Sequence, residues 1–229
     1  MIRSLIRNGV THVKLTNVEG QRYIGTGLMA NWVSIEIEGV PGEDLAAFMD
    51  GPTVVVHNNA QDGVGNTMNN GKVVVCGIAG DVVGYGMRGG RVYIQGDVGY
   101  RVGIHMKGYL DQQPIVVVGG KAGNFFGEYM AGGTMVLLGV GTDNRPVVGD
   151  YCATGMHGGT IYIRGEVEDH QLGKEVKRFP LDEGDVAVLK PILLDFVREV
   201  AVDEDVLDFD RYVKIVPVST RPYGKLYAY

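Results

Sequence analysis

The sequence has little of what catalytic and metal sites are usually made from. Of its 229 residues two are cysteine, Cys76 and Cys152, and three are serine, Ser4, Ser34 and Ser219. No serine lies in a G-x-S-x-G elbow, and no C-x-x-C, H-x-x-x-H or H-E-x-x-H spacing occurs. The chain therefore lacks the usual signatures of serine hydrolases and of zinc sites. Two isolated cysteines suit a reducing compartment.

Excess charge of one sign and long apolar runs are also scarce. The net charge is −6, with no basic cluster of the kind that marks nucleic-acid or anionic-lipid binding. No apolar stretch reaches the length of a membrane span, and the first 30 residues hold no uninterrupted apolar segment typical of a secretory signal. These absences predict a cytoplasmic protein that binds neither nucleic acid nor membranes.

Glycine is abundant instead, with 36 residues against a usual share of about 7%. The glycines recur with a fixed spacing, because residues 72–90, 91–108 and 114–133 each read as a short β-branched run followed by glycines and a methionine. The residues that close these runs are Gly39, Asn58, Gly77, Gly96, Gly120, Gly139 and Gly165. The steps are 19 residues, apart from five extra residues at 109–113 and seven spread over 142–153. Such a period indicates a repeat architecture.

The columns of this repeat predict a fold. Two and four residues before each closing position stand aliphatic residues, which alternate with a mixed column and so face one side of a strand. The structural glycines of the repeat are Gly77, Gly80, Gly84, Gly96, Gly99, Gly103, Gly120, Gly123, Gly127 and Gly139. We expect an all-β, right-handed parallel β-helix with one strand per coil of about 19 residues, whose coils turn at glycine.

Three parts of the chain follow from this pattern. Residues 1–30 are predicted to form an N-terminal cap or an irregular first coil, 31–173 the β-helix, and 174–229 a small α-helical C-terminal cap and tail. In the last part, 185–200 is typical of a helix with Asp185 as its N-cap, which Pro191 either kinks or starts. A second short helix is expected at 203–212 and a strand at 213–218.

Several chemistry-bearing patterns have a plainer explanation in the repeat. The G-x-G-x-x-G of 84–89 is followed at once by the next coil rather than by a helix, so repeat glycines explain it better than a dinucleotide loop. The methionine column fits a packed ladder better than a cofactor contact. A reactive thiol at Cys152 would need a lowered pKa and a nearby base such as His157. His57, His105 and His157 do not share a phase, and these three and His170 are expected to be surface or hydrogen-bonded histidines rather than metal ligands.

Departures from the repeat are the places where function is expected. These are the two insertions, 109–113 and 142–153, and the C-terminal tail. The tail residues Arg221, Tyr223, Tyr227 and Tyr229 have the chemistry of interface anchors, although the tail could equally fold onto its own β-helix.

The repeat resembles the GXGXG-motif β-helix family, which forms the C-terminal domain of the glutamate synthase large subunit and the β-helix subunit of formylmethanofuran dehydrogenase. The segments GDVGYRVGIHMKGY (96–109), GEYMAGG (127–133), TGMHGGTIYIRG (154–165) and HQLGKEVK (170–177) and the ending RPYGKLYAY (221–229) look most like a stand-alone version of the glutamate synthase domain.

This resemblance implies a non-catalytic structural subunit in a hetero-oligomer. It would brace a glutaminase-type amidotransferase subunit against an FMN-binding synthase subunit, with ammonia passing to an acceptor to give glutamate or N-methylglutamate. No catalytic, cofactor or metal residues are then expected in this chain, because FMN and the iron–sulfur cluster belong to the partners. The alternative is the β-helix subunit of a formylmethanofuran dehydrogenase or formyltransferase/hydrolase complex. An independent enzyme such as an esterase is a third hypothesis, which the missing nucleophile disfavours.

Overall fold

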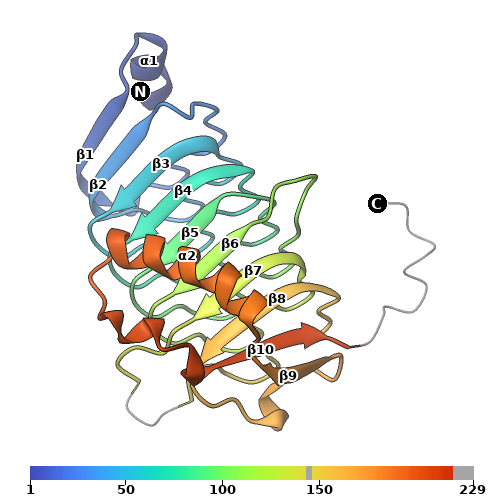
Figure 1. Cartoon of the computed structure of the whole chain (residues 1–229). Coiled ribbons are helices and arrows are strands. Elements are labelled where there is room, and N and C mark those ends of the chain that lie inside the picture. Colours follow the sequence, from blue (N-terminus) through green and yellow to red (C-terminus); the bar gives the residue numbers. More distant parts are fainter. Residues whose placement is uncertain (143–145, 219–229) are drawn as a thin grey trace.

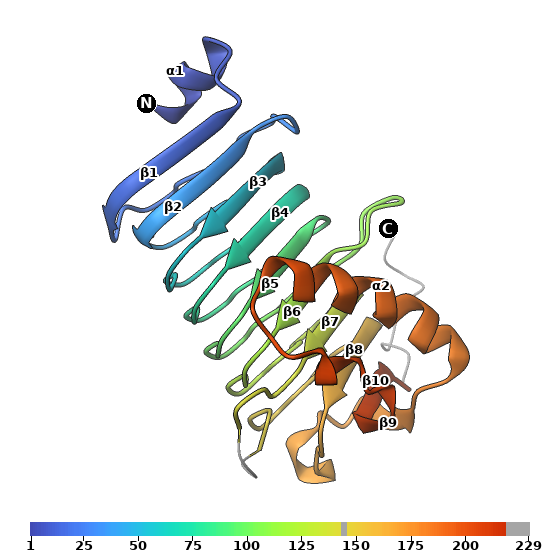
Figure 2. The ribbon, with the colours of Figure 1, turned by 60° about the vertical axis from the view of Figure 1, so that its left-hand side comes forward.

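The computed structural model describes residues 1–142 and 146–218, and its main feature is one ten-stranded sheet. Eight strands follow one another in parallel, each one coil further along the axis (Figure 1). They are β1 (His12–Glu19), β2 (Ser34–Val40), β3 (Asp50–Val56), β4 (Asn70–Val75), β5 (Arg91–Ile94), β6 (Ile115–Val118), β7 (Ala131–Leu137) and β8 (Gly158–Arg164). The predicted all-β parallel β-helix is confirmed, and its coils form a row along one axis (Figure 2).

The inward ladders follow the predicted phase. Paired strands bring Ile35, Val54, Val73, Val92, Val116, Met135 and Ile161 side by side. All of these side chains are fully buried, and so is the methionine column from Met49 to Met130. Each fully buried aliphatic side chain is worth roughly 1.5–3 kcal/mol of hydrophobic free energy. The interior is therefore a packed core rather than a channel.

Opposite the sheet, each coil runs through three left-handed residues separated by single residues of other conformation. In one coil these are Arg101 (φ 57°), Gly103 (φ 71°) and His105 (φ 57°). The two outer amides donate to the following coil and the middle one donates to the preceding coil, as Gly103 N does to Val83 O at 2.8 Å. Main-chain hydrogen bonds thus join neighbouring coils on this side as well as in the sheet. We call it the motif face.

The middle left-handed position points into the core; Ala46 and Ala153 hold it in two coils, but at Gly103 and Gly127 there is no room for a side chain. A Cβ on Gly103 would lie 2.3 Å from Met135 Sδ, and one on Gly127 would lie 2.4 Å from Ile161 Cδ1. Other glycines of the repeat lie against turn carboxylates, since a Cβ on Gly99 would lie 1.8 Å from Asp81 Oδ1. This crowding is the physical reason for the glycine spacing.

The first insertion lies where the sequence predicts it. Residues 109–113 make a tight turn closed by pairing between Tyr109 and Gln112. Pro114 then takes the corner position that Gly90 (φ 76°) and Gly133 (φ 89°) hold in neighbouring coils. Proline cannot adopt such a φ, so the insertion also changes the path of this corner.

The second insertion has the predicted seven extra residues but ends earlier than predicted. Val148 already lies beside Ala122, and Gly149 packs against Asn124, so residues from Val148 onward are back in register. The extra residues therefore precede Val148, and the prediction that they spread to Ala153 is wrong. The apolar pair Val147 and Val148 re-enters the core without a glycine to mark the phase.

The N-terminal residues form a short helix and then a first coil. Helix α1 (Ile2–Arg7) has no buried residue, although Ile2 and Ile6 pack partly against the core. Strand β1 follows and pairs with β2, with an irregularity between Leu15 and Val18 where Asn17 is left-handed (φ 57°).

The C-terminal residues close the other end of the sheet. Strand β10 (Tyr212–Pro217) pairs antiparallel with β8, and β9 (Val176–Pro180) pairs antiparallel with β10. Helix α2 (Glu183–Glu199) instead crosses the outer face of the sheet (Figure 1). Short 3-10 turns at Asp169–Gln171, Glu204–Leu207 and Phe209–Arg211 complete this part.

The predicted N-cap of this helix is wrong, and one of the two alternatives for Pro191 is excluded. Its N-cap is Asp182, whose side chain accepts from the Asp185 amide, while Asp185 is the third helical residue and completes a capping box. Pro191 lies inside the helix and does not start it.

The mixed column of the repeat suggests an outer sheet face that accepts any residue type. The structure differs, because α2 buries this face over β4 to β8. Its apolar residues Leu189, Ile192, Leu193 and Phe196 pack on Val74, Tyr93, Val117, Val136 and Tyr162. Tyr93 stacks edge-on against Phe196 at 5.5 Å and donates a hydrogen bond to Asp195 Oδ2 at 2.8 Å. Lys72 and Arg91 also pair with Asp195, so α2 is fixed by both packing and charge.

Candidate partner-binding surfaces

The motif face carries rings at its surface, and all but one of them belong to outer left-handed residues. Residues of one column lie in adjacent coils, about 4.8 Å apart, so their rings can stack. His105 stacks on Tyr129 with centroids 5.4 Å apart, and Phe125 stacks on Tyr151 at 5.0 Å. Tyr85 meets His105 edge-on at 6.0 Å. We call these five residues the aromatic strip.

An ion pair between a buried carboxylate and an exposed arginine lies beside the strip. Glu128 is 7% exposed, and its Oε2 lies 3.3 Å from Arg101 Nε. The Arg101 guanidinium also lies over the Phe125 ring, 5.4 Å from its centroid. Because a buried carboxylate is costly without a partner, this pair holds Arg101 against the rings.

A groove of about 560 Å³ opens beside the strip. Its lining residues are Thr67, Tyr85, Gly86, Arg88, His105, Lys107, Gly108 and Tyr109. None of these is acidic, although the chain as a whole has a net charge of −6. We call it the basic groove; the first insertion supplies one end of it through Tyr109, and Leu110 beside it is 81% exposed.

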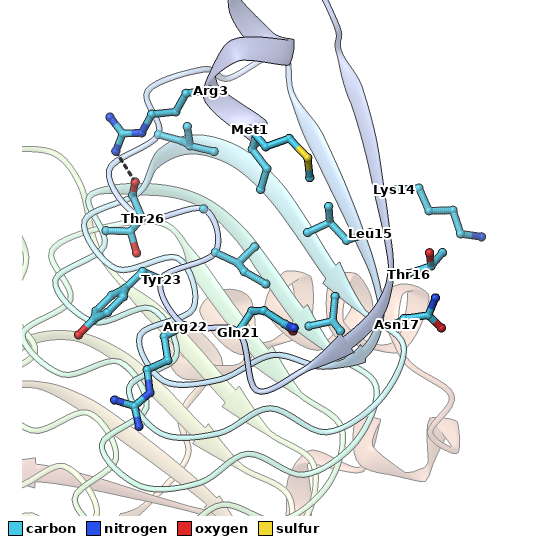
Figure 3. A pocket seen from close by; sticks show the side chains of 15 residues that line it. Met1, Arg3, Lys14, Leu15, Thr16, Asn17, Gln21, Arg22, Tyr23 and Thr26 are labelled. Atoms are coloured by element: carbon cyan, nitrogen blue, oxygen red, sulfur yellow. Dashed lines mark hydrogen bonds between the residues drawn. The ribbon is translucent and has the colours of Figure 1, made fainter.

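A second cavity, of about 640 Å³, lies at the N-terminal end of the core (Figure 3). Leu15, Val18 and Ile24 line it, and the Arg3 guanidinium donates to Thr26 O at its rim at 2.8 Å. Lys14 and Arg22 pair with Glu38 and Glu43 of this chain. The cavity is therefore the partly covered end of the apolar core, with little unbalanced charge around it.

The cysteines and histidines do not gather into a site. Cys152 is fully buried in the core column of Phe126, and burial raises the pKa of its thiol to about 12, which opposes the reactive-thiol hypothesis. Cys76 is half-buried; desolvation, and after it the nearby Glu199, raise the pKa of its thiol. His57, His105 and His170 are exposed, and half-buried His157 has its Nδ1 3.1 Å from Gly155 O, as predicted for surface or hydrogen-bonded histidines. Among residues 1–142 and 146–218, no group of three His, Cys, Asp or Glu side chains could hold a metal ion.

The predicted surface residues have mixed outcomes. The insertion 109–113 borders the basic groove. Arg221, Tyr223, Tyr227 and Tyr229 lie outside the described residues. The aromatic strip was not predicted. Its residues His105, Phe125 and Tyr129 each lie two residues from the middle glycine of a left-handed run, and this spacing could have identified them. No helix within the described part of the chain is long and apolar enough to cross a membrane.

Parallel strands joined by coils that each contain an alternating left-handed run make this chain a glycine-motif β-helix protein. Residues 4–218 match the model of the GXGXG motif family, and the chain belongs to this family. It is 48% identical over 226 residues to an uncharacterized protein of Methanocaldococcus jannaschii, covering 95% of this chain and 86% of that protein.

A solved structure has a similar fold. It is a chain of the formyltransferase/hydrolase complex of Methylorubrum extorquens, determined in complex with methylofuran. The TM-score is 0.63 and the sequences are 24% identical, over 80% of this chain and 67% of that one. At this level of identity the likeness concerns the fold.

Proposed function

We propose that this chain is a non-catalytic structural subunit of a glutamate synthase-type complex. The observation that carries the proposal is the family match from residue 4 to residue 218, which spans nearly all of the described chain. The match to the Methanocaldococcus jannaschii protein leaves only a small part of that relative uncovered, which supports a stand-alone β-helix chain. The packed interior and the exposed aromatic strip fit a molecule that works through its surface.

In this proposal the chain braces two other subunits. One is a glutaminase-type amidotransferase that releases ammonia, and the other is an FMN-binding synthase that adds it to an acceptor. The products would be glutamate or, with methylamine chemistry, N-methylglutamate. FMN and the iron–sulfur cluster reside in the partners, and the protein acts in the cytoplasm.

A second candidate has an observation of its own. The similar chain from Methylorubrum extorquens belongs to a formyltransferase/hydrolase complex, so this chain could hold the same place in a complex of that type. Its partners would then be metal-dependent hydrolase and pterin-containing subunits, rather than a flavoprotein.

Affinity purification from the native cells separates the candidates. The tag belongs at the N-terminus, because Met1 is 90% exposed and α1 has no buried residue. Co-purification of a flavoprotein and an amidotransferase, seen by mass spectrometry and by flavin absorbance, is the expected result. Recovery of molybdenum or tungsten pterin subunits would favour the second candidate. Turnover by the isolated chain would refute both scaffold hypotheses.

A further inference from the structure

We infer that the outward side of α2 is a contact between two copies of this chain, which pack antiparallel about a two-fold axis. The inference goes beyond the proposed function, because it concerns the isolated chain and holds whichever other subunits the chain binds. We call the exposed residues on this side of the helix the α2 stripe: Glu183, Ala187, Pro191, Leu194 and Arg198.

The α2 stripe lies on the side of the helix that faces away from the sheet. Its members are spaced by three or four residues, as neighbours on one helix face are. The opposite side, which packs on the sheet, consists of Leu189, Ile192, Leu193 and Phe196. In both views of the ribbon α2 lies outside the strands, and no other described helix or strand covers its outward side (Figure 1 and Figure 2). The stripe is therefore open to a second protein surface.

The α2 stripe is more apolar than a helix side that meets only water. Leu194 is 38% exposed, and Val188 at the edge of the stripe is 50% exposed. Together with Ala187 and Pro191 they make α2 apolar around most of its circumference. A helix that is apolar all round is normally buried all round. The sheet covers one side of α2, and a second surface has to cover the other.

Charge identifies that second surface as another α2. Glu183 lies in the first turn of the helix and Arg198 in the last. Arg198 Nε donates to Leu194 O at 3.1 Å, and neither charged side chain forms an ion pair with a described residue of its own chain. In an antiparallel pair of helices, Glu183 of each copy lies opposite Arg198 of the other. In a parallel pair, like charges would meet instead.

The sizes of the side chains agree with the same arrangement. The register that sets Glu183 opposite Arg198 also sets the small Ala187 opposite the larger Leu194, and both pairings share one centre, between Lys190 and Pro191. A surface that is complementary to itself about one centre is what a two-fold contact requires. Lys190 lies at the edge of the stripe, where its long side chain reaches solvent in the pair.

The size of the contact sets its expected strength. The 17 residues of α2 make a helix about 25 Å long. A single pair of such helices lies at the small end of specific protein interfaces, so we expect a monomer–dimer equilibrium that depends on concentration. Sedimentation velocity of the purified full chain should show a species that approaches twice the chain mass of 24.7 kDa as concentration rises. A monomer at every concentration would overturn the inference.

Cross-linking locates the contact. A dimer prepared from a mixture of isotopically light and heavy chains is treated with a lysine-reactive cross-linker and digested. The expected product is a mixed-isotope peptide pair that joins Lys190 of one copy to Lys190 of the other, because both lie next to the centre of the contact. A dimer that gives no such pair would contradict the inference.

Exchange of the two charges tests the direction of packing. Glu183→Arg and Arg198→Glu should each raise the dimer dissociation constant at least about tenfold, because each change sets like charges opposite each other twice. The double variant restores opposite charges at both places and should dimerise nearly as tightly as the native chain. Both substitutions oppose the helix dipole, so a loss caused by a weakened α2 would grow in the double variant instead of disappearing.

Matched controls make the same charge changes at exposed residues outside α2. Glu166→Arg and Arg88→Glu should leave the dissociation constant unchanged. Equal losses in these controls, or a double variant that does not recover, would refute the inference. If the chain is a monomer alone, but Lys190 cross-links to a different subunit in the native complex, the inference falls while the proposed function stands.

Discussion

Replacing Gly103 by alanine tests the explanation of the glycine spacing most directly. The residue is left-handed at φ 71°, which costs an alanine about 1–2 kcal/mol. Its new Cβ would lie 2.3 Å from Met135 Sδ and 2.5 Å from Met135 Cε, and Met135 is fully buried. Overpacking of this kind costs about 1–3 kcal/mol. The free energy of unfolding should therefore fall by about 2–5 kcal/mol, measured by urea denaturation followed by circular dichroism.

The matched control is Gly9→Ala. Gly9 is also left-handed, at φ 87°, but a Cβ there meets nothing within 4 Å, so only the conformational cost remains. The double variant Gly103→Ala with Met135→Ala removes the clash, so it should be less destabilised than the sum of its single variants by about 1–3 kcal/mol. Equal losses for Gly103→Ala and Gly9→Ala, or strict additivity in the double variant, would refute the steric explanation.

Three further predictions concern α2, the thiols and the first insertion. Burial opposes the charge of Asp195, but hydrogen bonds from the sheet outweigh it and hold the pKa of Asp195 below its usual 3.8. Its stabilising effect is thus present above that value and is lost as pH falls through the lower folded pKa, so Asp195→Asn should flatten the decline of the unfolding free energy below about pH 4. Iodoacetamide should leave Cys152 unmodified in the native protein and react slowly with Cys76, whereas both thiols react once unfolded; a rapid native adduct at Cys152, seen by mass spectrometry, would contradict its burial. Deleting 109–113 together with Pro114→Gly restores the regular corner and should change the melting temperature by only a few degrees; collapse of the fold would show that the turn is structural.

The coil phase and the core could be predicted because both depend on simple periods. The 19-residue spacing places Val54, Val73 and Val92 in one ladder, and the two-residue period of a strand makes them point inward. Two methionines of the packed column, Met87 and Met106, follow from the same spacing. The ladder needs no knowledge of distant parts of the chain, since each coil contacts mainly its neighbours.

The position of α2 could not be predicted in the same way, because it depends on residues far apart in the sequence. Leu189, Ile192 and Leu193 show helical spacing, but nothing local indicates whether such a helix covers the end of the solenoid or its outer face. The contacts that decide it join Tyr93 and Lys72 to Asp195, more than 100 residues away.

The motif face was missed for a different reason. Arg101, His105, Phe125 and Tyr129 are left-handed although none is glycine, and residue type gives no sign of that. Hydrogen bonds to adjacent coils hold these residues in place, so the conformation is imposed by stacking rather than by local preference. The rings meet in space only because of it.

Helix α2 also makes the molecule mechanically uneven along its axis. It packs across β4 to β8 and its cluster reaches only Val55 of β3, while β10 holds the last coil, and β1 and β2 have neither support. In a solenoid held by neighbour contacts, opening starts at whichever end is least restrained. Amide hydrogens of the first two coils should therefore exchange with solvent before those of β5 to β7, so that the protein frays from its N-terminal end. Any partner seated at that end would slow this exchange from a distance, by removing the place where unfolding begins.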